Sequence, residues 1–383
     1  MNLIHRHIFA NVFVTCAAAV GLFGFVLMIG NAMKDILPYV ISGQLAPDTT
    51  FRLMLLMVPF VTYYALPMGM LTGILLVLGR MSADREITAL RASGVSVAWL
   101  SAPIIFLALL GVAAGLLINF HFMPLTRLAY LREKAEAVRH NPLNFIVEKT
   151  FIRDFPGVVI YVSEKRGTRL RDFWIWELDS QNRVKRFARA DTGRLDFDVP
   201  NNKLRLTLER AQIEQRDEKD PEDFTKQMPR DPGGDLMAVD LPLGKLTGET
   251  IVQKKLKWFT FPQLMAEWSR LGRPDRDHPE ISEADRAKQR MRVQITIQEK
   301  FATAFSVLSF ALVAIPLGIK VSRKETSANL GIGLLLTLGY YFVTILAGWF
   351  DNHPELRPDL IIWLPNIVFQ GLGLWLFYKV DRA

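Results

Sequence analysis

Six apolar stretches, each long enough to cross a lipid bilayer as a helix, constrain the fold of this chain more than any other feature. A bilayer core of about 30 Å needs about 20 mostly apolar residues in helical conformation. The stretches form two groups of three, at residues 8–33, 53–79, 97–123, 301–319, 328–350 and 360–378. Between the groups lie about 175 residues without such a stretch, enough for a domain with its own core.

This arrangement predicts the fold class. We expect an α-helical membrane protein with six transmembrane helices (3+3) and an inserted domain. The predicted parts are residues 1–123 and 301–383, which hold the helices, and residues 124–300 between them. A chain that is 50% hydrophobic yet 22% charged fits this mixture of membrane helices and a water-exposed domain.

Basic residues predict the orientation, because cytoplasmic connections of membrane proteins carry an excess of Lys and Arg. Two connections are rich in these residues: Arg80, Arg85 and Arg91 in one, and Lys320, Arg323 and Lys324 in the other. The connections that alternate with them are poor in such residues. Both termini are therefore expected in the cytoplasm and the inserted domain outside it. The net charge of +8 needs no nucleic-acid partner.

The inserted residues show strand patterns. Residues 158–162 form a continuous apolar run typical of a buried strand, and residues 195–199 and 204–208 alternate with a period of two. Asn201-Asn202 between the alternating runs indicates a hairpin turn. Residues 217–235 are charged and rich in Pro and Gly, which is typical of a loop or insertion. We expect a β-rich domain of the sandwich or open jelly-roll type with helices at both ends.

A polar segment at residues 82–96 separates the second and third apolar stretches. At helical spacing one face carries Ala83, Ile87, Leu90 and Gly94, and the neighbouring face carries Asp84, Thr88 and Arg91. Gly94 suits a left-handed helix end. Glu86 is an acid in a basic connection, so it either pairs locally with Arg85 or Arg91 or presents its carboxylate to a partner. On periodicity alone a solvated turn is the simpler reading.

The sequence contains no recognisable catalytic or metal-binding motif. The P-loop pattern is absent, so no means of ATP hydrolysis is visible. The six His are scattered and Cys16 is the single cysteine, so neither a metal site nor a disulfide is expected. We expect a non-catalytic protein without a cofactor.

Three cations lie near the outer ends of the first three apolar stretches: Lys34, Arg52 and Arg127. Together they suit a phosphorylated or acidic lipid headgroup, because charge-assisted hydrogen bonds are strong. The alternative for each residue is ordinary snorkelling to the membrane interface.

Four motifs carry a resemblance to a known family. GRMSADREITALRASGVS (79–96), preceded by ALPMG (65–69), resembles the LptF/LptG permeases, and so do AIPLG (314–318) and WLPNI (363–367). The resemblance extends over essentially the whole chain.

The resemblance implies a function and partners. Two related six-span permeases would sit above a dimer of a cytoplasmic P-loop ATPase in the bacterial inner membrane. The complex would extract lipopolysaccharide and pass it to periplasmic bridge proteins through β-jellyroll domains. By resemblance, residues 82–96 form the coupling helix that docks on the ATPase. The residues expected to carry this contact are Asp84, Arg85, Glu86, Leu90, Arg91 and Gly94, with Glu86 matching the family's acidic position. Lys34 resembles the basic residues that contact lipid phosphates.

Two other functions remain open at this stage. One is an ABC-type subunit that acts on a different lipid or on a lipoprotein. The other is a membrane-anchored receptor or scaffold whose outside domain binds a partner. A secondary transporter is disfavoured, because the apolar stretches are nearly free of the ionisable residues that such proteins place near the bilayer midplane.

Overall fold

The structure is a computed structural model. It describes residues 3–41, 45–140, 148–153, 157–167, 169–179, 183–198, 203–216, 230–232, 236–242, 256–272, 283–320, 326–349 and 357–382. The chain divides into two compact units. The first comprises Met1–Asn31, Leu56–Leu128 and Lys254–Ala383, and the second Ala32–Leu55 and Ala129–Gln253.

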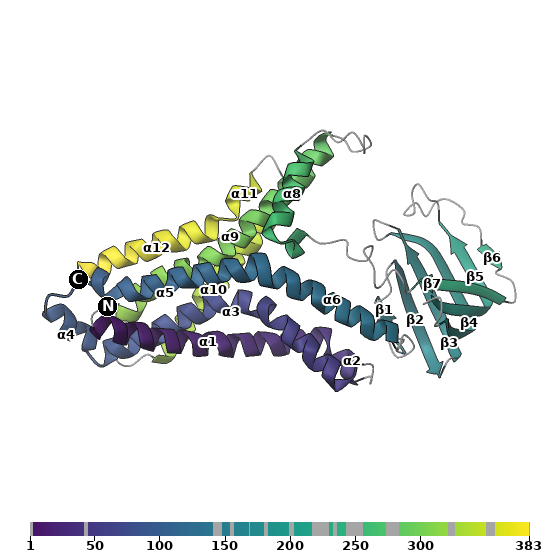
Figure 1. Cartoon of the computed structure of the whole chain (residues 1–383), viewed down its shortest axis with the longest axis horizontal. Helices are drawn as coiled ribbons and strands as arrows, with labels where there is room; N and C mark the ends of the chain where they lie inside the picture. Colours follow the sequence, from purple (N-terminus) through teal and green to yellow (C-terminus); the bar gives the residue numbers. More distant parts are fainter. Residues whose placement is uncertain are drawn as a thin grey trace. The chain divides into compact units, whose positions relative to one another are not determined.

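The first unit is a bundle of long helices (Figure 1). The elements that build it, some continuing into the second unit, are α1 (Leu3–Asp35), α3 (Pro47–Ala83), α4 (Glu86–Ala92), α5 (Val97–Leu117), the π-helical turn η1 (Ile118–Phe122), α6 (Met123–His140), the 3-10 helix η3 (Leu256–Trp258), α8 (Phe261–Leu271), α9 (Glu283–Lys320), α10 (Thr326–Gly348), α11 (Pro358–Ile361) and α12 (Leu364–Asp381). The short helix α2 (Leu37–Ile41) belongs to the second unit.

Five of the six predicted membrane stretches appear as helices long and apolar enough to cross a bilayer. They are Leu3–Asp35, Pro47–Ala83, Val97–Lys134, Arg286–Lys320 and Pro358–Asp381. The remaining stretch forms α10, in which the apolar part Gly331–Leu346 is shorter. The structure therefore establishes a helical membrane-type protein with five candidate spans.

Helix α9 occupies the centre of the bundle. In an apolar segment of 18 residues of α9, 72% of the residues are buried, compared with 17% in the corresponding segment of α1 and 22% in that of α12. Its Phe310 and Ala314 are fully buried together with Leu78 of α3 and Ile104 of α5. The outer helices α1 and α12 therefore expose the apolar faces that a bilayer would cover.

Glycines permit the close helix crossings. A Cβ at Gly73 would lie 2.6 Å from Cys16 Cα of α1, and one at Gly373 would lie 2.8 Å from the backbone of Leu312 in α9. Such positions let helix backbones approach each other closely. Gly331 and Gly339 of α10 differ, because a Cβ at either would meet nothing within 4 Å.

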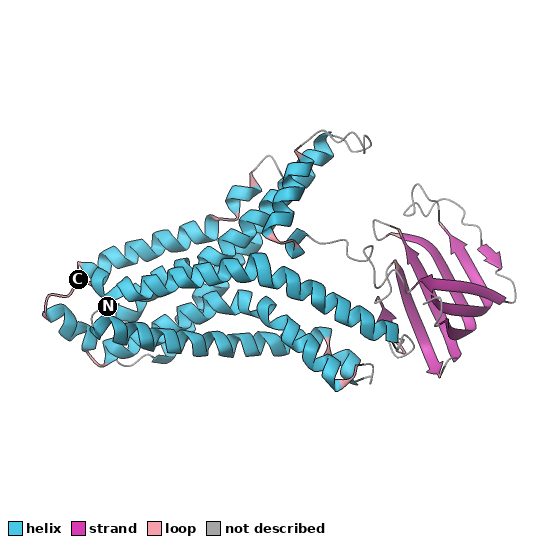
Figure 2. Ribbon diagram, in the orientation of Figure 1, coloured by secondary structure: helices cyan, strands magenta, loops and turns pink. Residues whose placement is uncertain are grey.

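All described strands belong to the second unit (Figure 2). They form one antiparallel sheet in the order β1-β2-β3-β4-β5-β6, and β7 also pairs with β5. Their bounds are β1 (Phe151–Ile152), β2 (Val158–Arg166), β3 (Arg169–Leu178), β4 (Val184–Asp198), β5 (Lys203–Gln215), β6 (Arg230–Pro232) and β7 (Leu236–Pro242). The antiparallel β-domain is thus confirmed at this coarser level.

The predicted hairpin is present. Strands β4 and β5 pair up to Asp198 opposite Lys203, and the predicted turn Asn201-Asn202 lies outside the described residues. Most of residues 217–235 is also outside them, but β6 falls inside this predicted loop.

One face of the sheet is buried and the other is half-exposed. Ile160, Val162 and Phe173 are almost fully buried, whereas the Trp174 and Trp176 rings lie on the opposite face, tilted to each other with their centres 5.8 Å apart. The continuous apolar run 158–162 predicted a buried strand, and β2 is present there with Ile160 and Val162 buried. Burial alternates along β2, as in a strand with only one covered face.

Candidate functional site

The polar segment after α3 is not one continuous helix. Helix α3 ends at Ala83, Arg85 has a positive φ of 59°, and α4 covers only Glu86–Ala92. The predicted single helix over 82–96 is therefore wrong. A residue in the left-handed conformation cannot continue a right-handed helix. The chain therefore turns at Asp84 and Arg85, and a new helix begins at Glu86.

Gly94 ends α4 as predicted. Its φ is +88°, its N–H donates to the carbonyl of Arg91, and the N–H of Val95 donates to Leu90. This pair of hydrogen bonds is the Schellman arrangement, in which a left-handed glycine satisfies the last helix carbonyls. Ser96 then caps α5 by accepting a hydrogen bond from the N–H of Trp99.

The faces of α4 agree with the predicted periodicity. Ile87 is buried and Leu90 is half-buried against the apolar core, while Glu86 and Arg85 are exposed. Arg91 is half-buried. Asp84 forms an ion pair with Arg80 at 3.8 Å, and both side chains are mostly exposed, so this pair contributes little to stability. Helix α4 is thus anchored by an apolar side and presents the Glu86 carboxylate outward.

An open pocket of about 760 Å³ lies beside α4 within the helical unit. Its polar lining comes from three helices: His7, Asn11 and Thr15 of α1, Arg80 of α3 and Glu86 of α4.

Several helix ends are tied together near this pocket. Ser82 donates a hydrogen bond to the carbonyl of Ile319 at the end of α9 (2.8 Å). His5 of α1 contacts the carbonyl of Trp99 in α5 through Nε2 at 3.0 Å. These contacts join α3 to α9 and α1 to α5.

The three predicted rim cations have different surroundings. Lys34 is exposed in the last turn of α1. Arg52 forms an ion pair with Glu133 of α6 at 3.5 Å. Arg127 is half-buried, with its guanidinium 5.6 Å from the centre of the Trp258 ring. Arg52 and Arg127 therefore already contact side chains of this chain. Lys34 and Arg52 belong to the second unit and Arg127 to the first.

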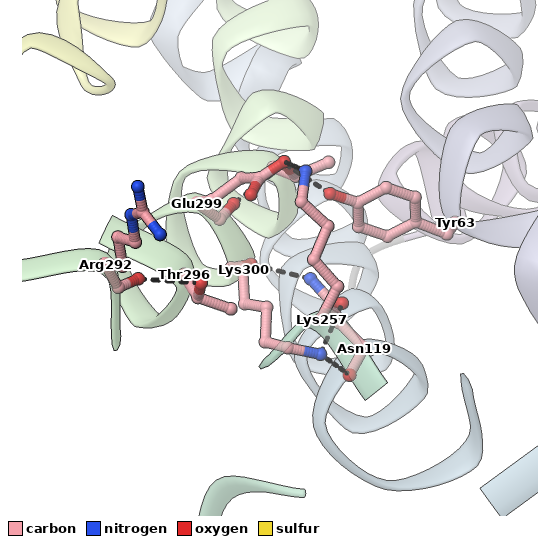
Figure 3. Close-up of polar contacts among 8 residues, drawn as sticks. Tyr63, Asn119, Lys257, Arg292, Thr296, Glu299 and Lys300 are labelled. Atoms are coloured by element: carbon pink, nitrogen blue, oxygen red, sulfur yellow. Dashed lines mark hydrogen bonds and ion pairs between the residues drawn. The ribbon is translucent and has the colours of Figure 1, made fainter. Parts of the chain in front are cut away.

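A buried polar cluster on α9 escaped the sequence prediction (Figure 3). Lys300 is only 4% exposed, and its ammonium donates to the backbone carbonyl of Asn119 at 2.8 Å. Asn119 in turn donates from Nδ2 to the carbonyl of Lys300 at 2.9 Å. Glu299 and Lys300 lie in the same long helix as the fourth predicted stretch, immediately before residues 301–319.

Neighbouring contacts complete this cluster. Glu299 forms an ion pair with Lys257 of η3 at 2.8 Å, and Tyr63 of α3 donates to Thr303 at 2.7 Å. The sequence signal was the Glu299-Lys300 pair directly before an apolar run, together with Asn119 inside the third stretch.

Asn366 of the WLPNI motif forms a second buried network. Its Nδ2 donates to the carbonyl of Ala302 (2.7 Å), and its Oδ1 accepts hydrogen bonds from Ser309 (2.8 Å) and Tyr340 (3.2 Å). The motif therefore joins α12 to α9 and α10. Among the described residues, no cluster of three or more His, Cys, Asp or Glu suits a metal ion.

Long apolar helices and an antiparallel β-domain define the architecture of a multi-pass membrane-type protein. The family model of the lipopolysaccharide export system permeases LptF/LptG matches residues 6–379, and the chain belongs to this family. No curated protein matches the chain at a significant level.

Proposed function

We propose that this chain is a permease subunit of an ATP-driven ABC transporter that extracts lipopolysaccharide from the inner membrane and passes it to a periplasmic bridge. The observation that carries the proposal is the family match over residues 6–379. The transporter would also contain a second permease of the family and a dimer of a separate P-loop ATPase.

In this proposal the chain spans the membrane six times, with α10 as the fifth span. Residues 1–123 and 301–383 form the two groups of three spans and residues 124–300 form the periplasmic part. Both termini lie in the cytoplasm, and the β-domain acts as a jelly-roll that receives the lipid. No recognisable nucleotide-binding motif occurs in the sequence, so the work of ATP hydrolysis enters through contact with the partner ATPase.

The proposed contact with the ATPase is the segment Asp84–Gly94. Glu86 is its central residue, because it is exposed and offers a carboxylate to a basic partner side chain. Asp84, Arg85 and Arg91 would supply further polar contacts, while Leu90 and Gly94 fix the shape of α4. The hydrogen bond from Ser82 to Ile319 supports this role, because it links the end of α3 to α9.

The proposed lipid-headgroup residues are Lys34, Arg52 and Arg127. Lys34 is the best-supported candidate of the three, because its side chain is exposed at the end of α1. Arg52 and Arg127 have side-chain partners in this chain, so an anionic headgroup would compete with Glu133 for Arg52 and approach Arg127 beside Trp258.

Affinity purification of the tagged chain from native membranes, followed by mass spectrometry, tests the proposal. We expect a P-loop ATPase and a second permease of the family, and we expect the purified complex to release lipopolysaccharide from vesicles when ATP is added. Co-purification of the ATPase without lipopolysaccharide release would favour an ABC-type subunit for another lipid or lipoprotein. Recovery of the chain alone under mild conditions would favour a receptor or scaffold.

A further inference from the structure

Helices α5 and α9 meet along a regular antiparallel line of contacts, here called the α5–α9 seam. Its three levels are Gly111 against Val307, Gly115 against Ala304, and Asn119 against Lys300. A Cβ at Gly111 would lie 2.8 Å from a Val307 methyl group, so the backbones approach closely there. The spacing of four residues on α5 and of three and four on α9 keeps all three levels on one face of each helix.

The third level is polar, unlike the other two. The Lys300 ammonium lies 2.8 Å from the carbonyl oxygen of Asn119 and 3.4 Å from its Oδ1, and it is 5.6 Å from the centre of the Phe120 ring. Asn119 is 1% exposed. A charge buried in these surroundings costs much free energy unless hydrogen bonds satisfy it, so separating the helices here would leave Lys300 without its acceptors.

The adjacent acid does not hold Lys300. Glu299 accepts from Lys257 at 2.8 Å, on a different side of α9 from Asn119 (Figure 3). The partner of Lys300 in the described part of the chain is thus the Asn119 residue of the π-helical turn η1. Within η1 the N–H of Met123 bonds to the carbonyl of Ile118, five residues earlier, and such turns are frequent at functional positions.

We propose that Lys300 and Asn119 form a clamp that closes one end of the α5–α9 seam, and that this seam stays closed while the permease works. The third and fourth spans then move as one body. These are the segments through which the chain leaves the first group of spans and enters the second, so the clamp also holds together the two ends of the inserted region. Lys300 is a positioning residue in this proposal and does not contact the transported lipid.

The seam offers a test by disulfide formation. A Cβ at Gly115 would lie 3.4 Å from the Cβ of Ala304, close to the separation found in disulfides. The Gly115→Cys/Ala304→Cys pair is placed in the full chain with Cys16→Ala, so that no other cysteine is present. We expect a disulfide to form readily in membranes, and to form about tenfold more slowly when Lys300→Met or Asn119→Ala is added.

The functional arm rests on the proposed transport function. In the reduced state, Lys300→Met and Asn119→Ala should each lower lipopolysaccharide release by about tenfold, and oxidation of the cysteine pair should restore it. Lys288→Met, at an exposed position of the same helix, is the matched control. It should change neither the rate of disulfide formation nor lipopolysaccharide release. Asn119→Ala keeps the Lys300 cation and removes its partner. Reduced release in this variant would therefore indicate the clamp, whereas normal release would indicate that Lys300 binds an anion directly.

Three outcomes would overturn the clamp. Oxidation that stops transport when Lys300 and Asn119 are intact would mean that the seam must open. Oxidation that fails to rescue Lys300→Met would mean that the ammonium acts in another way. Disulfide rates unaffected by either variant would mean that the pair does not close the seam. The rate of disulfide formation is measured without a transport assay. If the parent complex releases no lipopolysaccharide, that result therefore counts against the proposed transport function and not against the clamp.

Discussion

Glu86 is the residue at which the proposed coupling can be tested most directly. Glu86→Ala removes an exposed carboxylate, so the stability of the helical unit should change by less than about 0.5 kcal/mol. ATP-driven lipopolysaccharide release should nevertheless fall by about tenfold, because the partner's cation loses its acceptor. Both quantities can be measured in a reconstituted complex, with Asp381→Ala, at another exposed acid, as the control. Normal release by Glu86→Ala would remove this residue from the contact.

Lys34 allows an equally direct test of the headgroup site. Lys34→Asp reverses an exposed charge in the last turn of α1, where an acid also interacts unfavourably with the helix dipole. Photo-crosslinking of lipopolysaccharide to probes in α1 should fall by about fivefold or more, because the phosphate loses a charge-assisted partner. Lys288→Asp, elsewhere on the surface, should leave the crosslinking unchanged. Equal crosslinking in both variants would show that Lys34 does not hold the headgroup.

Individual residues could be predicted from the sequence where local rules decide their conformation. Gly94 was predicted as a left-handed helix end, and its φ of +88° confirms it. Lys300 was missed because its burial depends on Asn119, which lies far away in the sequence. The left-handed backbone of Arg85 was also missed, because no local rule predicts a positive φ at an arginine.

Glycine spacing makes the contact between α1 and α3 testable at the level of whole helices. In Gly73→Ala the new Cβ would lie 2.6 Å from Cys16 Cα, so the two backbones must separate and the unfolding free energy should fall by about 1–3 kcal/mol. Gly21→Ala on α1 is the matched control, because its Cβ would meet nothing within 4 Å. That control should be neutral or stabilising by less than about 1 kcal/mol. Thermal unfolding in detergent measures both, and equal melting temperatures would show that α1 is not packed as described.

Elements were predicted well where periodicity and length were unambiguous. The long helices and the β4–β5 hairpin follow from apolar length and two-residue alternation. The break between α3 and α4 could not be predicted in this way, because residues 82–96 keep a helical period across Arg85. Strand β6 inside the predicted loop depends on pairing with β5, which is a tertiary contact.

At the scale of the whole molecule, the number of spans decides on which side of the membrane each terminus lies. Five spans would place the termini on opposite sides, whereas six place them on the same side. Helix α10 has 23 residues, which at 1.5 Å per residue is about 34 Å and enough for a bilayer core of about 30 Å. Its exposed Leu334, Leu335 and Leu338 are also more easily explained by contact with lipid or with another membrane helix than by contact with water.

Single cysteines in a Cys16→Ala chain would settle the topology with a membrane-impermeant maleimide. Leu3→Cys and Asp381→Cys mark the two termini, and Arg169→Cys marks the β-domain, all at exposed positions. With six spans, intact spheroplasts should label Arg169→Cys alone, and the termini should react only after the membrane is permeabilised. Labelling of one terminus in intact spheroplasts would mean that α10 does not cross. The second group of spans would then be incomplete, and the proposal of two six-span permeases above one ATPase dimer would fail for this chain.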